Sequence, residues 1–466
     1  MINKKFIWER KEVIKMNDTI AAISTSLGVG AISIIRISGN EAVEIVNKIV
    51  KNKNINSLKT HTINYNHIVE GDKIVDEVLI SLMKGPKSFT TEDVIEINAH
   101  GGIATTNKIL QLLLQNGCRL ATPGEFTKRA YLNGRIDLMQ AEGIMDLINS
   151  KTDKMRDLAI SQVGGNISQM IKDIRKKIIE VLANIEVNID YPEYEDIEVL
   201  TNEQLFPKLN HIELKIEAIL KNSENSRLIK EGIDTCIIGK PNVGKSSLLN
   251  KLLNEEKAIV TDIAGTTRDI VEGTIIIEGI IFNIIDTAGI RKTSDLVESI
   301  GVKKSIDLID KSDLVLFVLN NNEELTQEEE EILSKLKDKN YIIVVNKIDL
   351  ETKLNLKDYD LKNMVSISTI NNQGIEDLKN KIKEIYNLEQ IETTDVTYLT
   401  NARSIALLNE ALKAVKTAKS SIQDNIPIDM VEIDIKEAWS KLGEIIGQNY
   451  SEELIDQLFS QFCLGK

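Results

Sequence analysis

The residues with the clearest chemical potential run from Gly239 to Ser246 in the pattern Gly-x-x-x-x-Gly-Lys-Ser. Glycines at both ends let the backbone curl so that successive N–H groups point at phosphate oxygens, while Lys245 supplies a charge and Ser246 a hydroxyl for Mg²⁺. An apolar run from Thr235 precedes the loop, and a helix is expected to follow over Ser247–Leu253. Because a helix N-terminus favours an anion, this context predicts a nucleotide phosphate site rather than a chance glycine-rich turn.

Four further motifs follow in the order that a guanine-nucleotide domain requires. A threonine and an aspartate would serve Mg²⁺ and the terminal phosphate, and a carboxylate would accept from the paired donors of guanine, which adenine lacks. The motifs are Gly265-Thr-Thr-Arg-Asp269, Asp286-Thr-Ala-Gly289, Asn346-Lys-Ile-Asp349 and Ser366-Ile-Ser-Thr369. Each is weak alone, but their order and their places at the ends of expected strands predict GTP binding.

The catalytic apparatus departs from that of many small GTPases. Ile290 stands where those proteins have a glutamine that positions water, and an apolar side chain cannot do this. No arginine finger is evident, although Arg268 and Arg291 are available. A bound cation could replace the finger electrostatically, and Asn242 beside the phosphates is a plausible ligand for it.

Length and composition limit the class of protein. A chain of 466 residues predicts about three domains. The net charge of -14 argues against a general duplex-binding protein, so any nucleic-acid contact should be local or shared with a partner. The three cysteines, Cys118, Cys236 and Cys463, form no Cys-x-x-Cys pair, which argues against a zinc site and fits a reducing cytosol. We find no secretory signal and no run of about 18 apolar residues that would span a membrane.

Patterning predicts a multidomain α/β protein. Residues 1–16 are expected to be a disordered extension, with Met16 a candidate start, and residues 17–134 a compact α+β domain. Its expected strands are 31–38, 75–83 and 94–98, and its expected helices are 40–50 and 103–115. Residues 232–387 alternate strand and helix, which predicts a parallel sheet covered on both faces.

The remaining segments, 135–231 and 388–466, are expected to be helical. One apolar stripe repeats at three and four residues along the first of them: Ile171, Ile174, Ile178, Val181, Leu182 and Ile185. A tail of about seventy residues is small for its own core, so we expect it to pack on the earlier helices, with the GTPase domain inserted between. The alternative that the tail forms a separate small helical bundle stays open. Polar Asn222–Ser226 is expected to be a boundary, and acidic Glu323–Glu331 a solvated helix face.

The chain resembles the TrmE (MnmE) family of tRNA-modifying GTPases from about Asp18 to Lys466. The motifs that carry the resemblance are Arg36-Ile-Ser-Gly39, Phe89-Thr-Thr-Glu-Asp-Val94, His100-Gly-Gly102, Thr122-Pro-Gly-Glu-Phe-Thr127, Ala130-Tyr-Leu-Asn133 and Phe462-Cys-Leu-Gly-Lys466. The family ends in Cys-Ile-Gly-Lys, and leucine for isoleucine at Leu464 preserves volume and polarity. The resemblance implies a cytoplasmic homodimer that joins the FAD-containing MnmG in a heterotetramer, without a membrane.

The resemblance also implies the chemistry. The pair would add a carboxymethylaminomethyl or aminomethyl group at C5 of the wobble uridine of certain tRNAs. The one-carbon donor would be a tetrahydrofolate derivative, in its 5,10-methylene or 5-formyl form. GTP hydrolysis, stimulated by K⁺ and by dimerisation of the GTPase domains, would drive the cycle.

Site residues carry over from the family one by one. Folate would meet Arg36, Glu96, Arg135 and Lys466, although many relatives have lysine at 135. Mg²⁺ would be held by Ser246 and Thr267, K⁺ by Asn242, Thr261, Ile263 and Thr266, and the attacking water would be oriented by Glu298. The catalytic set is Glu298, Lys245, Thr267 and Cys463. The GTP contacts are Asn242, Val243, Gly244, Lys245, Ser246, Ser247, Thr261, Thr266, Thr267, Asp286, Thr287, Ala288, Gly289, Asn346, Lys347, Asp349 and Ser368.

Several alternatives stay open. From local sequence alone, Arg36, Glu96 and Arg135 are solvated surface charges. Cys463 is either a small buried apolar residue or a participant in modification, and His100 is expected to be structural. The competing function is a GTP-dependent RNA or ribosome assembly factor without modification activity, although such factors usually carry a second nucleotide domain or a basic RNA-binding domain, which we do not find.

Overall fold

The computed structural model describes residues 18–190, 202–255, 271–285, 301–388 without 358 and 360, and 399–465 without 449 and 451. The expected extension at 1–16 lies outside these ranges. The described chain forms two compact units. The first comprises described residues of Met1–Met145, Gln162–Lys208 and Lys413–Lys466, and the second those of Asp146–Ser161 and Leu209–Leu412.

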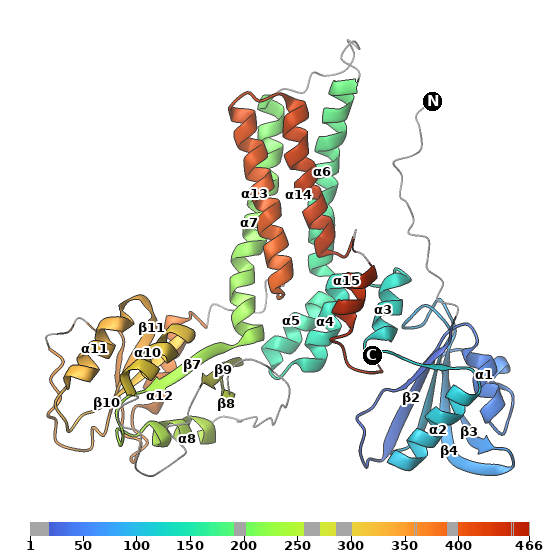
Figure 1. The fold of residues 1–466 in the computed structure, drawn as a ribbon, viewed down its shortest axis with the longest axis horizontal. Coiled ribbons are helices and arrows are strands. Elements are labelled where there is room, and N and C mark those ends of the chain that lie inside the picture. The colour runs from blue at the N-terminus through green and yellow to red at the C-terminus, as the bar shows by residue number, and fades with distance from the viewer. Residues whose placement is uncertain are drawn as a thin grey trace. The chain divides into compact units, whose positions relative to one another are not determined.

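The first unit begins with a mixed sheet, drawn in blue in Figure 1. Its described strands, in spatial order, are β3 (Thr62–Glu70), β4 (Lys73–Met83), β5 (Val94–His100), β2 (Ile32–Ser38), β1 (Ile20–Ile23) and β6 (Arg119–Leu120). Neighbouring strands are antiparallel except β1 and β6. We call this the N-terminal sheet.

One face of the N-terminal sheet carries its core. Inward side chains such as Ile35, Ile97 and Ile80 pack with Ile45 of α1 (Ala42–Ile49) and Ile109 of α2 (Ile103–Gln115). Because side chains alternate along a strand, the intervening residues point to the opposite side, which we call the open face. The expected α+β domain is confirmed, but β3 was not among its predicted strands.

Helices make up the rest of the first unit. They are α3 (Glu125–Leu132), α6 (Asn166–Asp190), α14 (Ile428–Ile445) and α15 (Glu452–Phe459), together with parts of α4 (Leu138–Asn149), α5 (Asp153–Val163), α7 (Asn202–Glu231) and α13 (Ala402–Gln423). The predicted apolar stripe is buried along α6. As expected, the tail packs on an earlier helix, because α14 lies against α6 (Figure 1). Arg175 of α6 lies over the Trp439 ring at 4.1 Å, and burial lowers the Arg175 pKa to about 10.

The second unit is built around another sheet, which we call the nucleotide sheet. Its described strands, in spatial order, are β12 (Met364–Ser366), β11 (Asn340–Asn346), β10 (Leu314–Asn320), β7 (Ile233–Ile238), β9 (Ile280–Ile285) and β8 (Val271–Ile277). The prediction of a parallel sheet was wrong at one edge, because β8 runs antiparallel to β9. A two-residue turn, Glu278-Gly279, joins these strands, which leaves no room for a crossover helix.

Helices cover both faces of the nucleotide sheet, as predicted. Leu248 of α8 (Lys245–Glu255) and Leu378 of α12 (Ile375–Ile385) join the core on one face. Ile309 of α10 (Gly301–Lys311) and Ile332 of α11 (Gln327–Lys335) join the core on the other.

The boundary predicted at Asn222–Ser226 was wrong, because α7 continues to Glu231. Ser223 Oγ donates to the carbonyl of Ile219 at 2.7 Å and accepts from the N–H of Leu399 at 3.0 Å. A serine hydroxyl can bond within its own helix, so polarity alone does not end one. Here Ser223 is a packing position.

Candidate functional site

The predicted phosphate loop lies between β7 and α8, and Lys245 begins α8. The Nζ of Lys245 donates to the backbone carbonyls of Gly239 and Lys240, at 2.7 and 2.6 Å. Burial lowers the Lys245 pKa from its ordinary value. The ammonium therefore lies within its own loop, where phosphate oxygens could replace the two carbonyls as acceptors. Asn242 is exposed in the same loop and has a φ of +62°.

Asn346, at the end of β11, joins the guanine motif to the phosphate loop. Its Nδ2 donates to the carbonyl of Val243 at 2.8 Å, and its Oδ1 accepts from the N–H of Thr369 at 3.2 Å. A Cβ on the next loop residue, Gly244, would lie 2.1 Å from Asn346 Nδ2. Only glycine fits there, and its φ of +102° is also one that glycine tolerates best.

The structure brings Asp349 and Ser368, both expected near the guanine base, into direct contact. The Ser368 hydroxyl donates to Asp349 Oδ1 at 2.6 Å and accepts from the N–H of Asn371 at 3.2 Å. Lys347, between Asn346 and Asp349, has a φ of +66°. The phosphate loop, Asn346-Lys-Ile-Asp349 and Ser368 thus form one continuous edge at the ends of β7, β11 and β12.

The other predicted nucleotide and metal residues lie outside the described residues. They are Thr261, Ile263, Thr266, Thr267, Asp286, Thr287, Ala288, Gly289 and Glu298. Of the predicted Mg²⁺ ligands only Ser246 is described, and it lies in the first turn of α8. Ser247 is exposed beside it.

A second cluster of predicted residues lies in the first unit, on the open face. Arg36 of β2 and Glu96 of β5 are direct partners in the strand register. Arg36 Nε and Nη2 both lie 2.9 Å from Glu96 Oε1. Both side chains are mostly buried, with 20% and 23% of their areas exposed. The structure therefore overturns the reading of these two residues as solvated surface charges.

Aromatic rings and the chain's last residues surround this pair. The Arg36 guanidinium lies 5.7 Å from the Phe126 ring centroid and 6.0 Å from that of Phe89. Arg135 lies 4.9 Å from the same Phe89 ring and donates to the Phe89 carbonyl at 2.6 Å. Arg135 is exposed, as expected of a surface charge, and lies beside the Phe89 ring that Arg36 also faces.

The C-terminal segment packs onto β1 and β2. The Gly465 carbonyl accepts from Arg36 Nη1 at 3.3 Å and from Ser24 Oγ at 3.1 Å. A Cβ on Gly465 would lie 2.5 Å from the Ile23 carbonyl oxygen. The Gly124 N–H donates to the Cys463 carbonyl at 3.2 Å, while the Cys463 side chain is exposed. The buried alternative for Cys463 was therefore wrong, and Lys466 lies outside the described residues.

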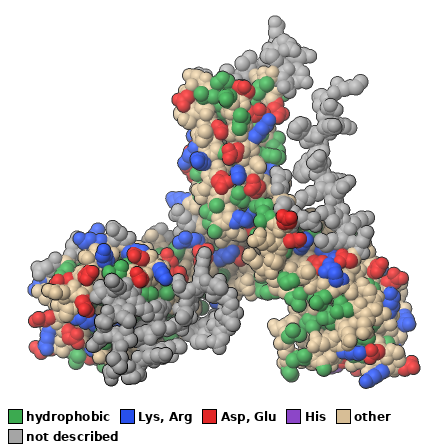
Figure 2. Space-filling model, in the orientation of Figure 1, with side chains coloured by type: hydrophobic (Ala, Val, Ile, Leu, Met, Phe, Trp, Pro, Cys, Tyr) green, Lys and Arg blue, Asp and Glu red, His purple; other side chains and the backbone are tan. Residues whose placement is uncertain are grey.

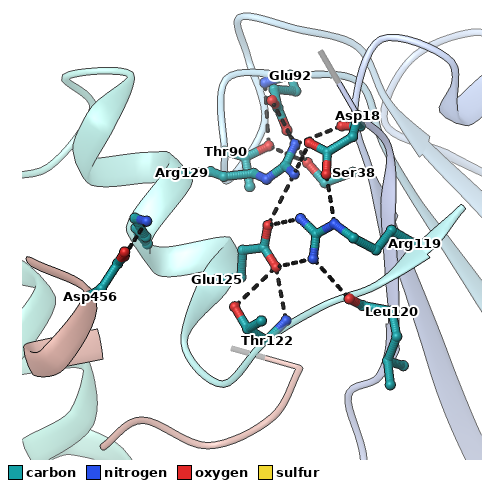
Figure 3. A network of polar contacts seen from close by, with 11 residues as sticks. Asp18, Ser38, Thr90, Glu92, Arg119, Leu120, Thr122, Glu125, Arg129 and Asp456 are labelled. Carbon is teal, nitrogen blue, oxygen red and sulfur yellow. Dashed lines mark hydrogen bonds and ion pairs between the residues drawn. The ribbon is translucent and has the colours of Figure 1, made fainter. Parts of the chain in front are cut away.

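An ion-pair network centred on the buried Arg129, which sequence reasoning missed, holds α3 in place (Figure 3). The Arg129 side chain is fully buried and its Nη atoms contact carboxylates of Asp18, Glu92 and Glu125 at 2.8–3.1 Å. Arg119 contacts Asp18 and Glu125 as well. The available signal was the spacing of Glu125 and Arg129, four residues apart on one helix.

Glu125 is charged in this network. Burial by itself raises the Glu125 pKa, but hydrogen bonds from Arg119, from the Thr122 backbone and from Arg129 bring it below its ordinary value. The network fixes the helix that carries Phe126, so it positions one wall around Arg36.

The acidic run also departs from expectation. Glu329 is buried, although its neighbours Glu328 and Glu330 are exposed. Its carboxylate lies 2.7 Å from Lys240 Nζ in the phosphate loop. Part of the predicted solvated face is therefore internal. His100, expected to be structural, pairs with β4, because its Nδ1 lies 2.7 Å from Asp76 Oδ1.

Comparisons with known proteins cover almost the whole chain. The family model "GTP-binding protein TrmE N-terminus" matches residues 19–135, and the model "MnmE helical domain" matches residues 138–463. The "tRNA modification GTPase MnmE" of Bacillus cytotoxicus is 50% identical over 455 residues, which are 96% of this chain and 99% of the relative. That of Lactococcus lactis subsp. cremoris is 52% identical over 449 residues, 96% of this chain and 98% of the relative. Within the described residues, no helix is long and apolar enough to cross a membrane.

Proposed function

This chain belongs to the MnmE (TrmE) family of tRNA modification GTPases, and on that premise we propose that it hydrolyses GTP to drive modification of the wobble uridine of tRNA. With the flavoprotein MnmG it would add a carboxymethylaminomethyl or aminomethyl group at C5, in the cytoplasm. The observation that carries the GTPase part is the joined edge of phosphate loop, Asn346 and Asp349.

The donors and acceptors of this edge suit a guanine nucleotide. Lys245 would exchange the carbonyls of Gly239 and Lys240 for phosphate oxygens, and Ser246 with Thr267 would hold Mg²⁺. Asp349 would accept from the base, with Ser368 holding its carboxylate in place. Asp286–Gly289 would respond to the terminal phosphate.

Ile290 cannot position the attacking water, and no arginine finger is evident to supply positive charge to the phosphates. Asn242, Thr261, Ile263 and Thr266 would hold K⁺, which when bound stabilises charge on the transferring phosphoryl group. Glu298 would orient the attacking water. The exposure of Asn242 within the phosphate loop supports this role, because its side chain is free to meet a cation beside the phosphates.

The cluster around Arg36 suits a tetrahydrofolate derivative. Such a molecule combines a planar ring that carries hydrogen-bond donors with a tail of carboxylates. Glu96 would accept from the ring, Phe89 and Phe126 offer apolar surface, and Arg36 and Arg135 would face negative charge. Lys466 would add a cation from the chain's end, next to Gly465, which already contacts Arg36.

The open face supports a homodimer. Ile63, Tyr65 and Leu79 lie on it, and Figure 2 shows hydrophobic side chains gathered on the surface of this part of the molecule. Apolar residues that neighbour one another on an exposed sheet are typical of an interaction surface. A second copy of the chain would cover them, and MnmG would complete a heterotetramer.

Nucleoside analysis of tRNA tests the proposal. Deleting the gene should remove the modification from wobble uridines, and the wild-type gene but not Lys245→Ala should restore it. Unchanged wobble uridines in the deletion strain, together with stable GTP-dependent co-sedimentation with ribosomal subunits, would instead favour the assembly factor.

A further inference from the structure

Glu329 is a buried carboxylate with three short contacts. It lies in the first turn of α11 and only 5% of its area is exposed. Its Oε2 accepts from the N–H and the hydroxyl of Thr326, at 3.0 and 2.9 Å, and lies 2.7 Å from Lys240 Nζ. A buried carboxylate is costly unless it is paired, so this arrangement depends on Lys240.

Lys240 links that carboxylate to the phosphate loop. It is the second residue of the loop, and only 22% of its side chain is exposed. Its backbone carbonyl is one of the two acceptors that hold Lys245 Nζ. The side chain of Lys240 is therefore tied to α11 while its main chain contacts the lysine expected to meet the phosphates.

The loop is thus held on both flanks. Asn346 binds the Val243 carbonyl on one side, at 2.8 Å, and Glu329 binds Lys240 on the other. Neither Glu329 nor any other residue of α11 belongs to the motifs that predicted nucleotide binding. The second flank is supplied by a helix that follows β10, which no motif assigns to the site.

We propose that Glu329 is a positioning residue for nucleotide binding, which acts through Lys240 to hold the phosphate loop in its curled form. The inference rests on the proposed role of the loop as the phosphate site. A loop that is already ordered loses less conformational entropy when the phosphates bind. Removing the ion pair should therefore weaken nucleotide affinity in a protein that is still folded.

The test compares five variants of the full chain with the wild type, by titration with a fluorescent GDP analogue and by thermal unfolding. Glu329→Gln keeps acceptors for Thr326 but removes the charge, and Lys240→Met removes the partner without touching the helix cap. We expect each to raise the Kd about tenfold, and the double variant to raise it no further, because one interaction is lost in all three. Glu328→Gln is the matched control, since it removes an exposed charge from the same helical turn.

Lys240→Arg keeps the charge and should bind GDP nearly as well as wild type. If Glu329→Gln and Lys240→Met lower the unfolding temperature but bind GDP like wild type, Glu329 only caps α11 and the inference is overturned. Additive losses in the double variant would contradict it too. A wild-type chain that binds no GDP would overturn the proposed nucleotide site itself, which separates the two failures.

Discussion

At the scale of single residues, Arg36 and Glu96 form a candidate site because the register of β2 and β5 places them opposite each other. Opposite charges that face each other across two central strands form a mostly buried ion pair beside Phe126 and the Gly465 carbonyl. Either charge alone would be poorly compensated there. The pair therefore has both a structural and a proposed ligand-binding role.

We predict that Glu96→Gln and Arg36→Met each weaken binding of 5-formyltetrahydrofolate by about tenfold or more, because each removes a charge-assisted hydrogen bond. Isothermal titration calorimetry on the full chain would measure this. Lys73→Met, at an exposed position of β4, is the control and should bind normally. Wild-type affinity in both site variants would remove the pair from the folate site.

His100 gives a pH prediction. The hydrogen bond to Asp76 and its negative charge raise the imidazole pKa above its ordinary value of 6.5. The imidazolium therefore favours the folded state below about pH 6.5, and this contribution is lost as the pH rises through the folded-state pKa. An NMR titration should find a raised pKa for His100 in the wild type and a normal one in Asp76→Asn. Equal values in both proteins would contradict the interpretation.

At the scale of elements, the placement of the C-terminal segment depends on the close approach of Gly465 to the backbone of β1. Gly465 has a φ of +85°, and a Cβ would lie 2.5 Å from the Ile23 carbonyl. We predict that Gly465→Ala releases residues 460–465 from β1, so that their amides exchange hydrogen faster and folate binding weakens, while GTP hydrolysis changes little. Leu464→Ala, at an exposed position, is the control. Unchanged exchange in Gly465→Ala would show that the contact is dispensable.

Helices and strands with a clear apolar pattern were predicted correctly from the sequence. The stripe from Ile171 to Ile185 predicted α6, and the apolar runs before Lys245 and Asn346 predicted β7 and β11. β3 was not predicted, although Ile63-Asn-Tyr-Asn66 alternates apolar and polar residues as a strand does. Asn66 is nevertheless buried, because its amide exchanges hydrogen bonds with the backbone of Asn52 at 3.2 and 3.1 Å.

The sites were predictable where a motif is local, and less so where partners come from distant segments. Gly239–Ser246 and Asn346–Asp349 could be recognised from spacing alone. The pairing of Lys240 with Glu329 and of Arg129 with three carboxylates depends on tertiary contacts between residues far apart in the chain. In each case one charged side chain, Glu329 or Arg129, is buried and paired with opposite charge.

The whole molecule joins two kinds of chemistry, a nucleotide site in the second unit and a proposed one-carbon site in the first. K⁺ dependence tests how the first of these works. We predict that replacing K⁺ with Na⁺ lowers GTP turnover by about tenfold or more, because a smaller cation fits the expected oxygen ligands less well. Steady-state phosphate release at constant ionic strength would measure it, and equal rates in both salts would remove Asn242 from the mechanism.

The most direct test of the central claim is reconstitution. The purified chain, MnmG, unmodified tRNA, GTP, K⁺, a tetrahydrofolate one-carbon donor and a nitrogen source would be combined, and the uridines analysed by mass spectrometry. We predict that a C5-modified wobble uridine forms with wild-type chain and is lost with Lys245→Ala, with Glu96→Gln, or when GTP is omitted. Steady GTP hydrolysis by the wild-type chain with no modified uridine, or equal modification by Lys245→Ala, would contradict the account.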